Sequence, residues 1–270
     1  MNDKADTLSA EPPETRRSTD AIDLRLLTYN VHRCLGIDGR YSPDRIARVI
    51  AESGADVIAL QELDAFRPRS GGVDQAMTIA AQLEMRVHFH PALRLEEELY
   101  GDAILSALPM RLVKADALPR PPGRIWEERG ALWVEIDLGG GNTLQVINTH
   151  FGLRDRERRM QADTIMGPAW MGRNDFRPPA ILLGDFNSVP TSEAYRRLTA
   201  RMRDAQRELP RPTKPTFPTR LPLLRIDHIF LMGEIEVRNV KALRSPAARI
   251  ASDHVPLAVD IRIPLKREPR

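Results

Sequence analysis

The sequence lacks the features that mark secreted and membrane proteins. Cys34 is the single cysteine, so no disulfide can form within the chain. No apolar run comes near the roughly 18 residues needed to span a bilayer. Residues 1–23 contain no hydrophobic stretch of the kind found in secretory signals. These absences favour a cytoplasmic protein with no membrane span.

Aromatic residues are also scarce, at 5% of the chain, which argues against extensive stacking on nucleic-acid bases. The remaining composition, 42% hydrophobic and 29% charged, is typical of a globular protein. A chain of 270 residues can form one large domain with a sizeable core. We expect a disordered tail at 1–23, a single domain at 24–263 and a short charged tail at 264–270, in a monomeric protein.

The formal charge of +3 is unevenly distributed. Residues 1–23 hold three basic and six acidic side chains, whereas residues 196–225 hold nine basic side chains against Asp204 and Glu208. A basic stretch can attract a polyanion such as nucleic acid. Because such a stretch is more often a solvated helix face, the charge gives nucleic acid only modest support as a partner.

Hydrophobic periodicity predicts strands and helices in alternation between the two tails. The expected strands are 24–31, 56–62, 103–107, 131–138, 144–150, 180–184, 226–232, 235–242 and 256–263. The expected helices are 43–53, 73–83, 154–166 and 192–200, the first with Ser42 as its N-cap and Gly54 at its end. Runs such as Val57-Ile58-Ala59-Leu60 are apolar on both faces, which requires a sheet covered on both sides. The fold class is therefore α/β or α+β, with sheets packed inside helices.

Most of the apolar runs end in residues that can bind a metal or move a proton. These residues are Asn30, Glu62, His150, Asp185 with Asn187, Asp227, and Asp253 with His254. A carboxylate or imidazole at the end of a buried strand is costly unless it is paired or bound to a metal. Because neighbouring strands can bring such ends together on one rim, we expect a single site there.

The residue types indicate what this rim binds. Glu62, Asp185, Asp253 and Asn30 offer oxygen ligands, which suit Mg²⁺, Mn²⁺ or Ca²⁺. Structural zinc is disfavoured, since there is no second cysteine and the histidines lack a zinc-helix spacing. Oxygen ligands with histidines, and no evident Ser-His-Asp set, indicate attack by water on a phosphoryl centre.

Two pairs of these residues suggest a division of labour. Asp185 and Asn187 are two apart and face the same side of an extended chain, so one can position water while the other holds the phosphate. Asp227 and His254 can form an oriented carboxylate–imidazole pair, which leaves the outer ring nitrogen free to bond a phosphoryl oxygen.

At these residues the sequence resembles the endonuclease/exonuclease/phosphatase superfamily. The matching segments occur in the family's order: Leu27-Thr28-Tyr29-Asn30-Val31-His32, Ala59-Leu60-Gln61-Glu62, Asn148-Thr149-His150, Gly184-Asp185-Phe186-Asn187, Ile226-Asp227-His228-Ile229-Phe230 and Ser252-Asp253-His254-Val255-Pro256. Each segment alone is weak evidence, but the series of six is strongly specific and spans residues 24–263.

The resemblance implies a four-layer α/β/β/α sandwich with two central mixed β-sheets. It also implies a divalent-metal-dependent hydrolase of phosphoester bonds, a phosphodiesterase or nuclease that uses metal-activated water. Mg²⁺, or Mn²⁺, would bind Glu62 with Asn30 and Asp253 close by. The phosphoester substrate could be a nucleic acid.

The resemblance further assigns roles to the remaining residues. Asp185 would orient or deprotonate the water, and Asn187 would hold the substrate phosphate. His254, oriented by Asp227, would stabilise the developing charge. His150 would contact a phosphate oxygen, and Arg129, before the strand at 131–138, would be a further phosphate ligand.

The sequence departs from the family pattern in several places. Asp102 stands where relatives commonly have Asn. The form Asn-Thr-His at 148–150 and Asp64 after Gln-Glu-Leu differ from the abasic-site endonuclease branch, which makes a dedicated DNA-repair enzyme less expected. A sphingomyelinase- or inositol-phosphatase-like hydrolase of a lipid or small phosphoester is the alternative. A catalytically silent binding module is a further one, although such modules usually lack a ligand or base and none is missing here.

Overall fold

The computed structural model describes residues 17–18, 20–95, 97–123, 127–210 and 214–266, which form two β-sheets and short helices. The first sheet contains β1 (Arg17–Ser18), β2 (Ala21–Asn30), β3 (Val57–Ala65), β4 (Arg86–Leu95), β5 (Glu98–Ser106), β12 (Glu236–Ala242) and β13 (Leu257–Pro264). The second contains β6 (Met110–Ala117), β7 (Gly130–Gly139), β8 (Asn142–His150), β9 (Ala180–Asp185), β10 (Arg203–Asp204) and β11 (Asp227–Met232). The α-helices are α1 (Pro43–Ser53), α2 (Gln75–Gln82), α3 (Asp155–Met166), α4 (Glu193–Thr199) and α5 (Ala248–Ala251). Three short 3₁₀ helices are η1 (His32–Cys34), η2 (Pro68–Ser70) and η3 (Ala205–Arg207).

Both sheets are mixed. The first has the order β12-β13-β2-β3-β5-β4, with β1 paired to β2, and the second has the order β10-β11-β9-β8-β7-β6. In each sheet one central pair is parallel, β2 with β3 and β8 with β9, while the other pairs are antiparallel.

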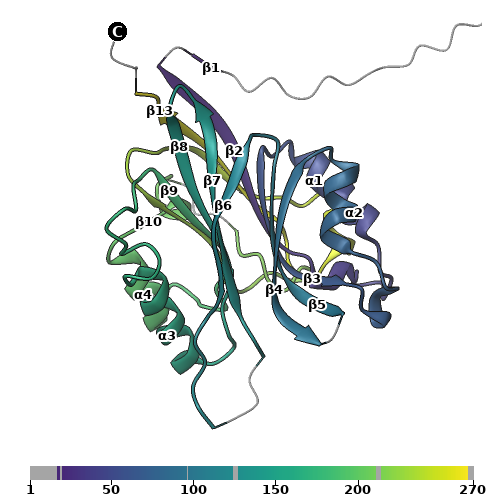
Figure 1. Ribbon diagram of the computed structural model, residues 1–270. Coiled ribbons are helices and arrows are strands. Elements are labelled where there is room, and N and C mark those ends of the chain that lie inside the picture. The colour runs from purple at the N-terminus through teal and green to yellow at the C-terminus, as the bar shows by residue number, and fades with distance from the viewer. Residues whose placement is uncertain (1–16, 19, 96, 124–126, 211–213, 267–270) are drawn as a thin grey trace, which may run out of the picture.

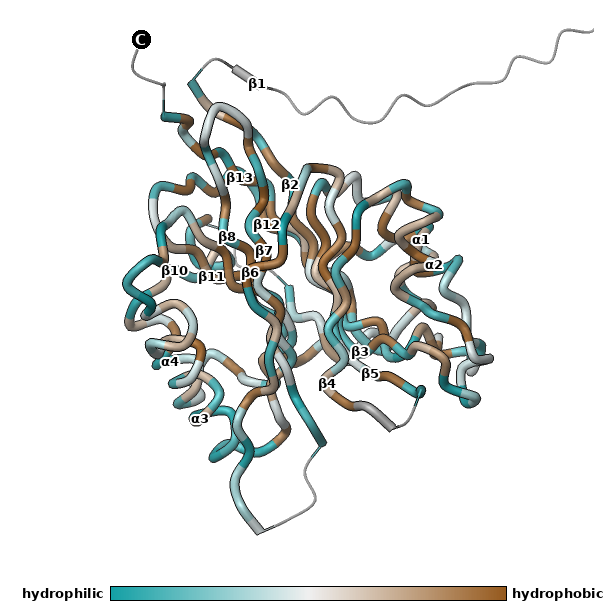
Figure 2. The backbone as a smooth tube through the Cα atoms, in the orientation of Figure 1, coloured by the Kyte–Doolittle hydropathy of each residue, from teal (hydrophilic) through white to brown (hydrophobic). Residues whose placement is uncertain are grey.

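The two sheets pack face to face, with helices on both outer surfaces (Figure 1). Leu26 of β2, Val146 of β8 and Leu183 of β9 belong to the buried cluster between the sheets. Ile46 of α1 packs in a second cluster, under α1 and α2, and Ile165 of α3 in a third, under α3 and α4. In Figure 2 the hydrophobic residues are concentrated on the strands that face one another. The predicted four-layer α/β/β/α sandwich with two mixed sheets is therefore confirmed.

Helix α1 begins and ends as its sequence predicts. The Ser42 hydroxyl accepts a hydrogen bond from the Arg45 backbone N–H at 3.2 Å, and Pro43 occupies the first turn, where its missing N–H costs nothing. Gly54 ends the helix with φ +62°, a left-handed conformation that glycine adopts without steric cost.

Four of the described strands were not expected from the sequence: the two-residue strands β1 and β10, and the longer strands β4 and β6. Strand β1 lies in the tail expected to be disordered, and β4 and β6 each form one edge of their sheet. Edge strands need not be apolar on both faces, and β4 contains Pro91 beside a register shift. At the N-terminus, β2 begins at Ala21, three residues before the expected start of the domain. Most of the expected tail at 1–23, and residues 267–270 of the tail at 264–270, lie outside the described residues. None of the described helices is long and apolar enough to cross a membrane.

The strand registers bring the expected site residues to one rim. Asn30, at the end of β2, pairs with Gln61 of β3. His150, at the end of β8, pairs with Asp185, at the end of β9, and Asp185 pairs with Asp227, where β11 begins. Because the two sheets pack against each other, these ends meet across the interface between them.

Candidate active site

Asn30 joins the two sheets at the rim. Its amide nitrogen donates to Glu62 Oε1 at 2.9 Å and to Asp185 Oδ2 at 3.0 Å. Its oxygen accepts a hydrogen bond from the His32 backbone N–H at 3.0 Å. One buried side chain of the first sheet is thus in contact with a carboxylate from each sheet.

A bulge in β3 directs Glu62 toward the site. The pairing of β3 with β5 shifts register between Leu60 and Leu63, and Glu62 has φ +62°. A positive φ is strained for a side chain other than glycine, and such strain is typical of functional positions. The bulge therefore places the Glu62 carboxylate beside Asn30 rather than in the regular alternation of the strand.

Asp102 of β5 lies opposite this bulge. Its side chain is buried and interacts with the backbone N–H of Glu62, and burial raises its pKa to about 8. At neutral pH the group is therefore mainly a neutral acid, which can donate a hydrogen bond as an amide does.

Gln61 and Asn148 connect the sheets directly beneath the site. Gln61 Nε2 donates to Asn148 Oδ1 at 2.8 Å, and Asn148 Nδ2 donates to the carbonyl oxygens of Leu60 and Ala103 at 2.8 and 2.9 Å. Both side chains are completely buried. The pair Leu60–Ala103 is the last one before the bulge, so Asn148 binds the backbone where the ladder is interrupted.

Asp185 occupies the centre of the rim. Gly184 before it lies so close to β8 that a Cβ atom would stand 1.9 Å from the Thr149 carbonyl oxygen, which requires glycine at this position. Asp185 Oδ1 accepts the Asn187 backbone N–H at 2.9 Å, while Oδ2 lies 3.6 Å from Nε2 of both His150 and His254. Burial raises the pKa of the Asp185 carboxyl, against the opposing effect of His254.

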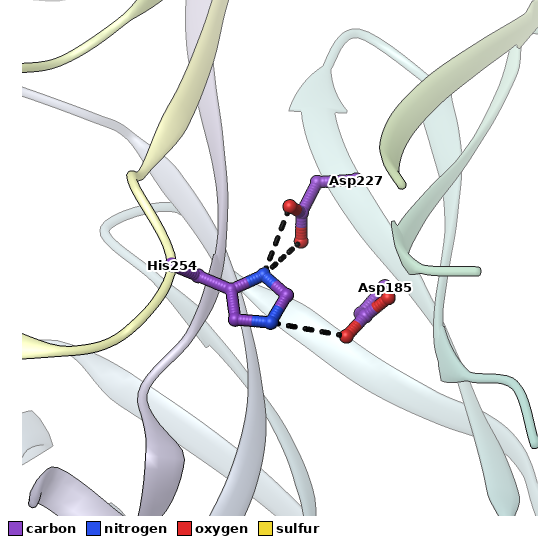
Figure 3. Close-up of side chains that lie close together, drawn as sticks. All are labelled: Asp185, Asp227 and His254. Atoms are coloured by element: carbon purple, nitrogen blue, oxygen red, sulfur yellow. Dashed lines mark hydrogen bonds and ion pairs between the residues drawn. The ribbon is translucent and has the colours of Figure 1, made fainter. Parts of the chain in front are cut away.

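His254 lies between two carboxylates (Figure 3). Its Nδ1 is 3.0 and 3.2 Å from the two oxygens of Asp227, and its Nε2 faces Asp185. Burial lowers the pKa of His254, but Asp227 and Asp185 outweigh burial and raise it above its ordinary value. These three residues offer ligand atoms within 4.8 Å of one another. The His254 ring thus links the carboxylate at the start of β11 with the carboxylate at the end of β9.

His150 differs from His254 in charge. Burial, together with Arg129 and His254, lowers its pKa well below the usual value, so the ring is neutral. Arg129 NH1 lies 3.0 Å from Nδ1, and a guanidinium can only donate. The proton of the neutral ring is therefore on Nε2, which lies 3.1 Å from Asn187 Nδ2 and 4.0 Å from Glu62 Oε1.

Asp253 is placed less centrally than the other expected residues. Its carboxylate lies 3.7 Å from His32 Nδ1, and its Oδ1 lies 3.3 Å from the Ser252 hydroxyl oxygen. The same hydroxyl donates to the Asn30 carbonyl oxygen at 2.8 Å, which ties Asp253 to the end of β2. In the described part of the chain no hydrogen bond joins the Asp253 carboxylate to the side chain of Asn30 or Glu62.

Two residues of the proline-containing segment 214–226, which precedes β11, complete the surroundings of His254, and Thr216 was not expected there. The buried Thr216 hydroxyl donates to Asp227 Oδ2, and the Phe217 ring packs on the His254 ring with centroids 4.7 Å apart. A loop without hydrophobic periodicity gives no sequence signal for such contacts. His228, by contrast, is structural: it is buried against Phe186 and Phe230 and bonds the Ser188 carbonyl at 2.7 Å.

The donor set at the rim fits a hard divalent cation. The carboxylates of Glu62 and Asp253 are 19% and 37% exposed, and neither forms an ion pair with an arginine or lysine among the residues that the structure describes. Both lie next to Asn30: Glu62 accepts a hydrogen bond from its amide, and Asp253 lies beside the Ser252 hydroxyl that donates to its backbone carbonyl. Oxygen atoms of carboxylates and amides are the ligands that Mg²⁺ and Mn²⁺ prefer.

Comparison with known proteins agrees with this architecture. Residues 27–254 match the sequence model of the Endonuclease/Exonuclease/phosphatase family. The uncharacterized protein YbhP of Escherichia coli K12 is 26% identical over 266 residues, which cover 91% of this chain and 98% of YbhP.

Solved structures with the same fold include two from Bacteroides. An endonuclease/exonuclease/phosphatase from Bacteroides vulgatus superimposes with a TM-score of 0.71 at 22% identity, over 88% of this chain and 98% of the other. The mannosyl-6-phosphatase Bt3783 of Bacteroides thetaiotaomicron gives 0.69 at 20% identity, over 88% and 99%. At these identities the likeness concerns the fold.

Proposed function

The chain belongs to the endonuclease/exonuclease/phosphatase family, whose members are generally phosphoester hydrolases, and on that premise we propose that it hydrolyses phosphoester bonds with the help of a divalent metal ion. The observation that carries the proposal is the convergence of Asn30, Glu62, Asp185 and His254, from both sheets, within hydrogen-bonding or ion-pairing distance of a neighbour in the set. Burying several carboxylates in one place costs free energy, and a module that only binds a partner does not require them.

Glu62, with Asn30 and Asp253 nearby, would hold the metal ion. Mg²⁺ is the proposed ion, with Mn²⁺ as a substitute, because all three side chains offer oxygen. When bound, such an ion supplies Lewis-acid polarisation of a phosphoryl oxygen. The remaining chemistry is the task of the protein's own side chains.

Asp185 is the proposed base. Its pKa is raised by burial toward the range in which a carboxylate accepts a proton from water near neutral pH. The Asn187 backbone N–H on Oδ1 and the Asn30 amide on Oδ2 fix the orientation of the carboxylate. Asp185 would thus orient the attacking water and take its proton.

His254 is the proposed cationic partner of the phosphoryl group. Asp227 holds it through Nδ1, which leaves the Nε2–H directed toward the centre of the rim. Since its pKa is raised, the ring is protonated and can stabilise negative charge that develops on phosphoryl oxygens.

His150 and Asn187 would hold the phosphate from the second sheet. The Nε2 atom of His150 and the Nδ2 atom of Asn187 are 3.1 Å apart, and both are donors once Arg129 has fixed the tautomer of His150. Asn187 Nδ2 already donates one N–H to the Phe151 carbonyl oxygen at 2.9 Å, so its second N–H and the His150 Nε2–H are the donors that one phosphoryl oxygen would accept. Arg129 thereby acts on the phosphate through His150; its guanidinium is buried and also pairs with Glu127 at 2.9 Å.

The proposal is tested by metal removal combined with substitution of Glu62. The purified protein is assayed on bis-p-nitrophenyl phosphate, a diester, and on p-nitrophenyl phosphate, a monoester, with Mg²⁺, with Mn²⁺ and with EDTA. Hydrolysis should stop in EDTA and return with Mg²⁺, and Glu62→Gln should require far more Mg²⁺ for half-maximal rate. Glu234→Gln, an exposed change of equal charge, is the control. Hydrolysis that persists in EDTA would refute the metal-dependent mechanism, and Mg²⁺ binding without any hydrolysis would favour a silent binding module.

A further inference from the structure

A basic groove lies beside the candidate site and has no role in the mechanism above. We define the basic groove by four side chains, Lys241, Arg244 and Arg249, which line a hollow of about 1010 Å³, and Arg220 at its inner end. Glu52 of α1 is the acidic side chain in the lining of that hollow. Positive charge therefore dominates this surface depression.

As far as the structure describes the chain, the cations of the basic groove do not pair with carboxylates, although Arg220 donates a hydrogen bond to the Ile37 carbonyl oxygen at 3.4 Å. Several other arginines of residues 196–225 do form such pairs. Arg196 and Arg197 both pair with Glu193, Arg203 pairs with Glu208, and Arg225 with Asp204. Within the described ranges, by contrast, none of the four side chains of the basic groove lies within 4.0 Å of a carboxylate oxygen. Their charge is thus available to a ligand.

Arg244 adds a second observation. Its Nε atom is buried and has no hydrogen-bond partner among the described residues. A buried N–H without an acceptor is costly, and a bound anion would provide the missing acceptor.

The basic groove extends toward the catalytic rim. Arg220, Arg244 and Arg249 also line a smaller hollow of about 110 Å³, whose wall includes Thr219 and Val255. Thr219 donates its backbone N–H to the Asp253 carbonyl oxygen at 2.7 Å, and Val255 follows His254 directly. The wall of the small hollow therefore includes two residues that adjoin Asp253 and His254, one by a backbone hydrogen bond and one in sequence.

The topology explains why the groove opens on this side. Ala242, the last residue of β12, pairs with Leu257 of β13, which pairs with Thr28 of β2. The segment after β12 consequently leaves the sheet at the edge where Asn30 ends β2. Arg244 and Arg249 are carried by this segment, so they belong to the same rim as the site.

We propose that the basic groove binds a second phosphate group of the substrate, one that is not cleaved while the first is held at Asp185 and His254. This proposal rests on the proposed hydrolase function and narrows its substrate to molecules with at least two phosphates. A nucleic-acid strand and a small bisphosphate share this chemistry, because each presents a further phosphate to guanidinium and ammonium groups.

The experiment compares ligands with one and with several phosphates on a double variant, Lys241→Gln with Arg249→Gln. Both side chains are exposed, so the substitutions leave the core intact. Arg86→Gln is the matched control, since Arg86 is an exposed arginine on β4, at the opposite edge of the same sheet. Binding of a fluorescein-labelled single-stranded DNA is measured by anisotropy in EDTA, and competition by inorganic pyrophosphate and by inorganic phosphate is measured against it.

The double variant should bind the strand about ten-fold more weakly for each contact that is lost. The slope of log affinity against log salt should fall by about 0.7 per contact. Hydrolysis of bis-p-nitrophenyl phosphate, which has one phosphate, should remain at the wild-type rate. If the double variant also binds pyrophosphate more weakly, while its affinity for inorganic phosphate is unchanged, a small bisphosphate fits the groove. If the double variant binds only the DNA strand more weakly, the second phosphate comes from a nucleic acid.

Equal strand binding by the double variant and by Arg86→Gln would overturn the proposal. Because binding is measured in EDTA, this outcome is separate from failure of the hydrolase function, which would appear as absence of hydrolysis of every phosphoester with Mg²⁺. A single Arg244→Lys variant, which keeps the charge but lacks Nε, should bind the strand with intermediate affinity. Unchanged affinity in Arg244→Lys would count against the role of the buried Nε.

Discussion

Replacement of Asn148 by leucine probes how the fold holds the candidate site. The side chain makes three buried hydrogen bonds, to the carbonyl oxygens of Leu60 and Ala103 and from Gln61, at 2.8 to 2.9 Å. Leucine has a similar volume but no polar atom, so the three partners lose an acceptor or donor that water cannot replace. At about 1 to 1.5 kcal/mol for each group, the free energy of unfolding should fall by about 3 to 5 kcal/mol.

The loss is measured by urea unfolding, followed through tryptophan fluorescence, with Asn174→Leu as a control at an exposed turn. The control should change the free energy of unfolding by less than about 0.5 kcal/mol. Asn148→Leu should also lower hydrolytic activity in the protein that remains folded, because the bulge that directs Glu62 loses its anchor. A loss of stability below about 1 kcal/mol would refute the reasoning, since it would mean that the network is not needed to join the sheets.

Two further predictions concern the surroundings of the histidines. Thr216→Val removes the hydroxyl that donates to Asp227, so His254 is held less firmly; we expect kcat to fall about ten-fold with little change in KM, and an unchanged kcat would exclude a positioning role for Thr216. His228 is buried, which together with Arg225 lowers its pKa to about 3 in the folded protein, against about 6.5 when unfolded. Its contribution to stability is therefore complete above pH 6.5 and is lost as the pH falls toward 3, because only the unfolded state takes up the proton. Between pH 6.5 and 5 the wild type should lose about 1 to 2 kcal/mol that His228→Phe does not lose, as measured by urea unfolding at each pH; parallel pH profiles would contradict the assignment.

The sequence predicts the rim well because the signals there are local. A buried apolar run that ends in Asp185 or His150 marks both the strand and the place where its side chains meet solvent, and parallel neighbours must end together. The caps of α1 are equally local, since Ser42, Pro43 and Gly54 each act within one turn.

Features that depend on distant partners could not be predicted. The edge strands β4 and β6 are paired on one side only and carry polar residues such as Lys114, so their periodicity is weak. Gln61 and Asn148 adjoin the expected site residues, but their bonds across the two sheets depend on how the sheets pack. The contact of Thr216 with Asp227 likewise joins a loop to a strand, and no spacing in the sequence specifies it.

The most direct test of the central claim is the rate of phosphodiester hydrolysis by Asp185→Asn with saturating Mn²⁺. The substitution keeps the shape of the side chain and removes the group that accepts the proton of water, while Glu62 remains in place to bind the ion. We predict that kcat falls by at least about a hundred-fold, with Mn²⁺ affinity, measured by electron paramagnetic resonance, within a few-fold of the wild type. A variant that keeps more than a tenth of the wild-type kcat would contradict the proposed role of Asp185, and with it the mechanism.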